Sequence, residues 1–248
     1  MRQILLRWMV LGGGILLLSC TEVPYVQSPG EWMPLPQRDV VSPEDRPVIL
    51  SLLEEAHEER APALFLYREE LTRPLVEDFF INLTGDPEVA LPILRYADKF
   101  DVPLFLAFSL AYVESEFYPF AVNENPSSVD RGLFQLNSRT FPFLTEEEFF
   151  DPEINARYGI SYLKYCLEEG GSEVLALAMY NAGKHRVFTR GAPAMTLRYI
   201  DKFFAYRTRL EKEFFSYLSS VIRPTDLERF FKTEVGRLQP VDMRKPSH

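Results

Sequence analysis

An apolar stretch that ends in two acidic residues constrains the fold most. In residues 107–120, AFSLAYVESEFYPF, apolar side chains recur at three- and four-residue spacing, which predicts a core helix. Pro119 prevents regular helix beyond the acids Glu114 and Glu116. A carboxyl at the edge of an apolar interior has a raised pKa, as a general acid requires. Glu114 is therefore a candidate for acid chemistry, and the alternative is an acid that caps a helix end in water.

Composition and charge exclude some partners. The 248 residues are 46% hydrophobic, which predicts one domain of ordinary size with an appendage. The net charge of −9 comes from 27 basic and 36 acidic residues. A phosphate-binding surface needs clustered Lys and Arg, so we expect no nucleic-acid partner. The three histidines are scattered without ligand spacing, and we expect neither a metal nor a cofactor.

The N-terminal residues predict export and a lipid anchor. Two arginines precede an apolar run, residues 9–18, that is shorter than the about 20 residues of a membrane-spanning helix. Residues 1–19 therefore resemble a secretory signal, and their end, Leu-Leu-Ser-Cys, resembles the bacterial lipobox, in which the cysteine becomes lipid-modified. The alternatives are an uncleaved anchor or ordinary signal cleavage. Lipid on Cys20 would attach the protein to a membrane, and Thr21 after it, in place of Asp, favours the periplasmic face of an outer membrane.

Cleavage before Cys20 would change the mature chain in two ways. Loss of Arg2 and Arg7, with no acid removed, changes the net charge from −9 to −11. Cys166 would remain as a free thiol, since a lipid-modified Cys20 cannot form a disulfide. Residues 20–43 are rich in proline, which favours an extended, polyproline-II-like tether.

From residue 44 onward the pattern is helical, and the chain is predicted to be all-α. The predicted helices span residues 48–59, 74–83, 87–100, 155–167, 195–209, 211–221 and 226–235. A further helix is capped by Ser172 and ends at residues 180–183. Residues 121–130 are predicted to be irregular, and the apolar run 174–179 to be buried on all sides. Tyr199 is expected to pack inward. We divide this part into a helical extension (44–100), a central domain (101–210), and C-terminal helices with a tail (211–248).

Four ordered blocks resemble one family. They are Glu114-Ser115-x-Phe117-x-Pro119-x-Ala121, Gly132-Leu133-Phe134-Gln135, Asp151-Pro152-x-x-Asn155 and Ala178-Met179-Tyr180-Asn181-Ala182-Gly183. In this order they resemble the SLT-type lytic transglycosylases over roughly residues 103–207. The resemblance implies a mostly helical, lysozyme-like domain that acts on peptidoglycan glycan strands. It also implies cleavage of the β-1,4 bond between N-acetylmuramic acid (MurNAc) and N-acetylglucosamine (GlcNAc).

The resemblance also assigns roles to residues. It implies one catalytic acid/base, Glu114, and a set of substrate-binding residues: Ser115, Asn123, Phe134, Gln135, Tyr180 and Asn181. Tyr180 and Gln135 would bond the N-acetyl groups or orient Glu114, with plain packing and backbone hydrogen bonding as the alternative. Phe134 would form an apolar wall for a sugar face. Asn155 is expected to be structural, as a helix-start residue.

One departure from the family pattern leaves the reaction open. Residues 130–139, DRGLFQLNSR, resemble the segment of animal-type lysozymes that carries their second carboxylate. Asp130 is therefore either a second catalytic carboxylate or an ion-pair partner on a loop. At roughly 5 Å from Glu114 it would serve as the nucleophile of a retaining hydrolase. A third hypothesis is a lipoprotein that binds peptidoglycan without cutting, in which residues 44–100 are an interaction platform rather than a structural extension.

Overall fold

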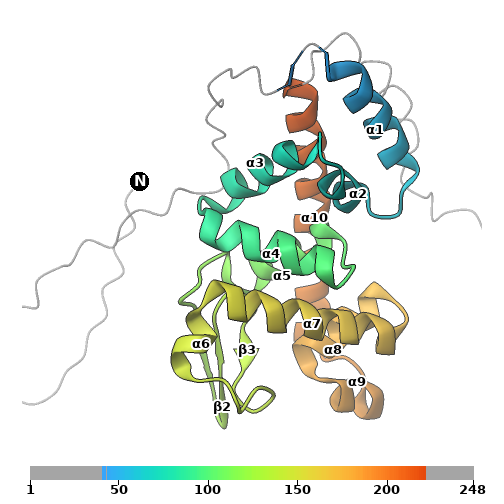
Figure 1. Ribbon diagram of the computed structural model, residues 1–248. Helices are drawn as coiled ribbons and strands as arrows, with labels where there is room; N and C mark the ends of the chain where they lie inside the picture. Colours follow the sequence, from blue (N-terminus) through green and yellow to red (C-terminus); the bar gives the residue numbers. More distant parts are fainter. Residues whose placement is uncertain (1–40, 43, 222–248) are drawn as a thin grey trace, which may run out of the picture. The chain divides into compact units, whose positions relative to one another are not determined.

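The computed structural model describes residues 41–42 and 44–221 (Figure 1). Its helices are α1 (Arg46–Glu58), α2 (Pro62–Arg68), α3 (Arg73–Thr84), α4 (Pro87–Lys99), α5 (Leu104–Ser115), α6 (Glu146–Phe150), α7 (Pro152–Gly170), α8 (Glu173–Ala182), α9 (Lys184–Arg190) and α10 (Ala194–Val221). Its strands are β1 (Val122–Asn125), β2 (Ser128–Arg131) and β3 (Leu136–Asn137). The predicted signal segment 1–19, the tether up to residue 40 and the helix 226–235 lie outside the described residues. Among the described helices, none is both long enough and apolar enough to cross a membrane.

The predicted all-α class is confirmed, with one small antiparallel sheet in the order β1-β2-β3. The hairpin of β1 and β2 corrects the prediction that residues 121–130 are irregular. Its register pairs Asn123 with Asp130, and β2 then pairs Asp130 with Asn137. Both strands of the hairpin lack buried residues, so the sequence has no apolar alternation that would indicate strands.

Helix α5 is a core helix, as predicted, and its first eight residues are buried on every side. Its residues Leu104 to Ala111 are all buried, and it packs against α4 and α10. The prediction for α8, that it is buried on all sides, is wrong. Val174 in its first turn is 53% exposed, and the buried run begins only at Ala176. Because α5 is fixed in the core, the acids at its C-terminal end have a fixed position.

Helix α10 is continuous, whereas two closing helices with a break near residue 210 were predicted. Leu210 is fully buried, so the apolar face continues through the predicted break. The pairs Arg207–Glu211 and Arg209–Glu213 are ion pairs at i,i+4 spacing that bridge it. In Figure 1, α10 passes α3, α5 and α8, and it packs against all three.

Aromatic packing joins the helical extension to the central domain. The rings of Phe80 in α3 and Phe108 in α5 stack with their centroids 3.9 Å apart. Phe214 of α10 meets Phe79 of α3 at 5.0 Å and Phe105 of α5 at 5.4 Å. All five rings are buried. Helix α4, which we assigned to the extension, also packs on α7.

Candidate active site

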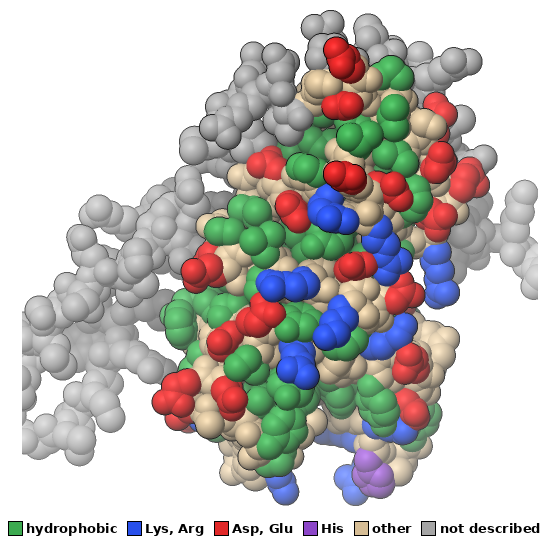
Figure 2. Space-filling view, viewed as in Figure 1, with side chains coloured by type: hydrophobic (Ala, Val, Ile, Leu, Met, Phe, Trp, Pro, Cys, Tyr) green, Lys and Arg blue, Asp and Glu red, His purple; other side chains and the backbone are tan. Residues whose placement is uncertain are grey.

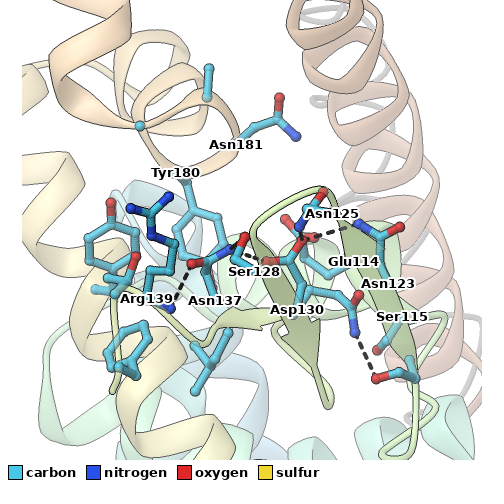
Figure 3. Close-up of a pocket in the computed structure, with 18 of the residues that line it drawn as sticks. Glu114, Ser115, Asn123, Asn125, Ser128, Asp130, Asn137, Arg139, Tyr180 and Asn181 are labelled. Carbon is cyan, nitrogen blue, oxygen red and sulfur yellow. Dashed lines mark hydrogen bonds between the residues drawn. The ribbon is translucent and has the colours of Figure 1, made fainter. Parts of the chain in front are cut away.

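A cavity of about 1050 Å³ opens beside the C-terminal end of α5. Its walls come from the β1–β2 hairpin, the segment after β3, the C-terminal end of α8 and the start of α9 (Figure 3). It brings together most of the residues that the sequence singled out: Glu114, Ser115, Asn123, Asp130, Gln135, Tyr180 and Asn181. Within residues 44–221, no group of three or more His, Cys, Asp or Glu side chains is placed to hold a metal ion.

Glu114 lies in the last turn of α5, partly buried at the edge of the cavity. Burial raises the pKa of this carboxyl to about 7, a hydrogen bond from Tyr199 opposes that rise, and the charge of Asp130 adds to it. Glu116, by contrast, is exposed and ends the helix in the left-handed conformation at φ 53°. Glu114 is therefore the acid whose environment suits proton transfer near neutral pH.

Tyr199 is the site residue that sequence reasoning missed. Its hydroxyl donates to Oε1 of Glu114 over 2.6 Å, from the second turn of α10. We predicted only that Tyr199 packs inward, because a tyrosine on an amphipathic helix looks the same whether or not its hydroxyl has a partner. Oε2 of Glu114 has no hydrogen-bond partner among the described residues, so this oxygen is the one available to a substrate.

Asp130 is held by three side-chain amides. Asn123 and Asn125 donate to its Oδ2 over 3.1 and 2.7 Å, and Asn137 donates to Oδ1 over 2.6 Å (Figure 3). It belongs to strand β2, and no ion pair joins it to a cation in the described part of the chain. The expectation of an ion-pair partner on a loop is therefore wrong. The hairpin register and these amides fix the carboxylate in the cavity wall.

Three predicted substrate-binding residues use their donors inside the protein. Nε2 of Gln135 donates to the carbonyl oxygens of Ala121 and Gly132, both at 3.0 Å. Tyr180 donates to the carbonyl of Phe134 at 3.0 Å, and Ser115 lies 2.8 Å from that of Leu133. These bonds hold the Gly-Leu-Phe-Gln segment against the ends of α5 and α8. The hydroxyl that orients Glu114 thus belongs to Tyr199 and not to Tyr180.

The other two predicted substrate-binding residues with side-chain amides, Asn123 and Asn181, are exposed. Asn123 is exposed on β1, and its amide donates to Asp130. Asn181 is exposed at the end of α8, and its Oδ1 accepts from Thr196 of α10 over 2.8 Å. Both line the cavity, where contact with a substrate stays a prediction.

Phe134 does not face the cavity. Its side chain is fully buried, and its ring packs so closely on Gly159 of α7 that a Cβ there would overlap it. The prediction of an apolar wall for a sugar face is therefore wrong. In the sequence, an aromatic residue of the core looks the same as one that packs on a sugar. Only the burial of the side chain in the structure distinguishes the two.

Asn155 is structural, but by a different means than predicted. The helix start belongs to Asp151, whose side chain caps α7, and Asn155 lies inside the first turn. Its buried amide accepts from the N–H of Phe134 and donates to the carbonyls of Arg131 and Phe149. Gly132 has φ 78°, and a Cβ there would overlap Asn155, so glycine is required beside this amide.

The comparison with known families agrees with this geometry. Residues 92–200 match the family model of the transglycosylase SLT domain. Neither a curated protein nor a solved structure matches the chain. The matched range contains Glu114, Asp130, Gln135, Tyr180 and Tyr199, and its mostly helical fold is the one that the resemblance implied. The chain therefore carries an SLT-type transglycosylase domain, formed by residues 92–200.

Proposed function

We propose that the protein is a peptidoglycan lytic transglycosylase that cleaves the MurNAc–GlcNAc β-1,4 bond and leaves 1,6-anhydroMurNAc ends. The observation that carries the proposal is Glu114, a cleft carboxyl whose pKa burial raises to about 7. At that pKa one group can donate a proton in the first step and accept one in the second near neutral pH. The SLT-type domain supports the substrate class.

The reaction needs one carboxyl because the substrate supplies the nucleophile. Protonated Glu114 donates from Oε2 to the glycosidic oxygen while positive charge develops at C1 of the muramoyl residue. The GlcNAc alcohol leaves, and the Glu114 carboxylate then takes the proton of the muramoyl 6-hydroxyl. That oxygen attacks C1 and closes the 1,6-anhydro ring. Glu114 ends the cycle protonated, and no water is consumed.

Two neighbours of Glu114 contribute without bonding to the reacting atoms. Tyr199 holds Oε1 and so leaves Oε2 for the glycosidic oxygen. Asp130 carries a negative charge near enough to raise the pKa of Glu114. The same charge stabilises the cationic character that develops at C1.

A pair of neighbouring acids tests the assignment of the acid. Glu114→Gln keeps the shape of the side chain and removes the transferable proton, so we expect less than a few per cent of wild-type turnover in zymograms of purified peptidoglycan. Glu116→Gln, two residues away and exposed, should be nearly silent. Substantial turnover by Glu114→Gln would overturn the assignment. A wild-type protein that binds peptidoglycan without cutting it would instead support the binding lipoprotein.

A lysozyme-type hydrolase is the second candidate, favoured by the three amides that hold Asp130 in the cavity wall. A nucleophilic Asp130 would form a covalent glycosyl intermediate that water resolves, which gives reducing ends. We expect anhydro ends, lighter by one water, in a mass spectrum of the wild-type products. For Asp130→Asn we expect a loss of about tenfold or less, or about 1.4 kcal/mol. Reducing ends together with near-complete loss in Asp130→Asn would establish the hydrolase.

We also propose that lipid on Cys20 anchors the enzyme on the periplasmic face of the cell envelope, with the outer membrane favoured. The lipobox-like sequence before Cys20 supports this proposal, and Cys20 lies outside the described residues. Cys20→Ser should move the protein from the membrane fraction to the soluble fraction. A variant that stays in the membrane fraction after a high-salt wash would contradict the anchor.

A further inference from the structure

Charged side chains of both signs line the cleft. Glu114, Glu116 and Asp130 supply carboxyl groups, and Arg139 and Arg186 line the same cavity from the segment after β3 and from α9. No ion pair joins either arginine to an acid in the described part of the chain. Two guanidinium groups therefore line the cavity without a carboxylate partner.

Arg139 is held in position, and most of its guanidinium N–H donors have no partner among the described residues. Its Nη1 donates to Oγ of Ser127 at the tip of the hairpin over 3.1 Å, and its backbone N–H donates to Oδ1 of Asn137 over 2.9 Å. A guanidinium has five N–H donors, so most of those of Arg139 remain available. Figure 3 shows the Arg139 side chain among the residues that line the pocket.

Arg186 differs from its basic neighbour on α9. Lys184 forms an ion pair with Glu169, which neutralises its charge. Arg186 is exposed, lines the cavity and makes no hydrogen bond or ion pair with another described residue. Figure 2 shows Lys, Arg and His side chains gathered at the end of the molecule where α9 lies. Arg186 thus brings an unpaired positive charge to the cavity lining, although the chain as a whole carries −9.

We propose that Arg139 and Arg186 form a subsite that binds a carboxylate of the glycan strand, a proposal that rests on the peptidoglycan substrate proposed above. Guanidinium groups bind carboxylates through paired N–H donors, and an acidic protein that takes a polyanionic strand needs local positive charge. The carboxylate has two sources in peptidoglycan. It is either the lactyl carboxylate of a MurNAc without a stem peptide or a carboxylate of the stem peptide.

Binding measured in the uncleaving Glu114→Gln protein tests the subsite separately from the reaction. Three soluble strands are compared: strands with free lactyl carboxylates, the same strands with these groups converted to methylamides, and peptide-bearing strands. We expect Arg139→Gln or Arg186→Gln to weaken binding of a carboxylate-bearing strand about threefold, as exposed charge pairs do. The double variant should weaken binding of the carboxylate-bearing strand about tenfold. The arginine variants should bind the methylamide strand with almost the same affinity as the parent protein.

The controls separate charge from fold. Arg190→Gln makes the same charge change on α9 outside the cavity lining and should leave all three affinities unchanged. Thermal melts should match the parent protein. Selective loss on free lactyl strands assigns the lactyl carboxylate, and selective loss on peptide-bearing strands assigns the stem peptide. Equal loss on the methylamide strand, or no loss on any strand, would overturn the subsite. Failure of the wild type to cut would instead count against the proposed reaction alone.

Discussion

Glu114 must carry a proton in order to donate to a glycosidic oxygen, and its pKa of about 7 places the loss of that proton near neutral pH. Burial favours the neutral carboxyl, so the acid form is populated below pH 7 and is lost as the pH rises through 7. We expect kcat/KM to fall about tenfold per pH unit above that value. Turbidity assays on purified peptidoglycan between pH 5 and 9 measure this limb. A flat profile across pH 6–8 would contradict the raised pKa.

Tyr199 acts on Glu114 through one hydrogen bond, so its removal should shift the pH profile as well as the rate. The bond stabilises the carboxylate and lowers the pKa of Glu114, and Tyr199→Phe should therefore move the descending limb to higher pH. Loss of a hydrogen bond to a charged group should also lower kcat about tenfold. Tyr158→Phe is the control, because its hydroxyl makes no hydrogen bond to another described residue. This variant should change neither the pH of the descending limb nor kcat. An unshifted limb in Tyr199→Phe would reduce Tyr199 to a packing role.

At the scale of elements, the sequence predicts what periodicity and capping encode. Helices α4 and α7 begin with an Asp cap followed by Pro, and α5 ends before Pro119. The hairpin was missed because polar strands paired through the backbone leave no alternation. Helix α10 was divided because charged residues near Leu210 resemble a surface break, although they pair across it.

Asn155 shows how one side chain can hold several elements together. It joins α7 to the Gly-Leu-Phe-Gln segment and to the end of α6 with three buried hydrogen bonds. Asn155→Ala would leave an N–H and two carbonyls without this partner, so we expect a loss of about 2–4 kcal/mol in the free energy of unfolding. Asn82→Ala is the control because its amide bonds a carbonyl at an exposed position. Urea unfolding measures both, and equal losses would refute the role of Asn155.

At the scale of the whole molecule, the ordered blocks of the sequence identified the family, and most of the predicted site residues line one cavity. The blocks could not identify contacts between distant segments. Tyr199 lies 85 positions from Glu114, and Arg139 and Arg186 enter the cleft from separate elements. Phe134 stands inside a block but in the core, because a block holds the residues that support a site along with those that line it.

The family match ends at residue 200, yet the core that fixes α5 extends past it. Phe214 of α10 contacts Phe79 of α3 and Phe105 of α5, and it is fully buried. We therefore expect Phe214→Ala to cost about 3–5 kcal/mol, as the loss of a buried ring does. Phe188→Ala is the control, since Phe188 lies inside the matched range but is 56% exposed, and it should change stability by less than about 0.5 kcal/mol. Urea unfolding of both variants decides the matter. The packing of α3, α5 and α10 requires the larger loss of stability in Phe214→Ala. A larger loss in Phe188→Ala would mean that residues 92–200 hold α5 in place without α3 and the C-terminal part of α10.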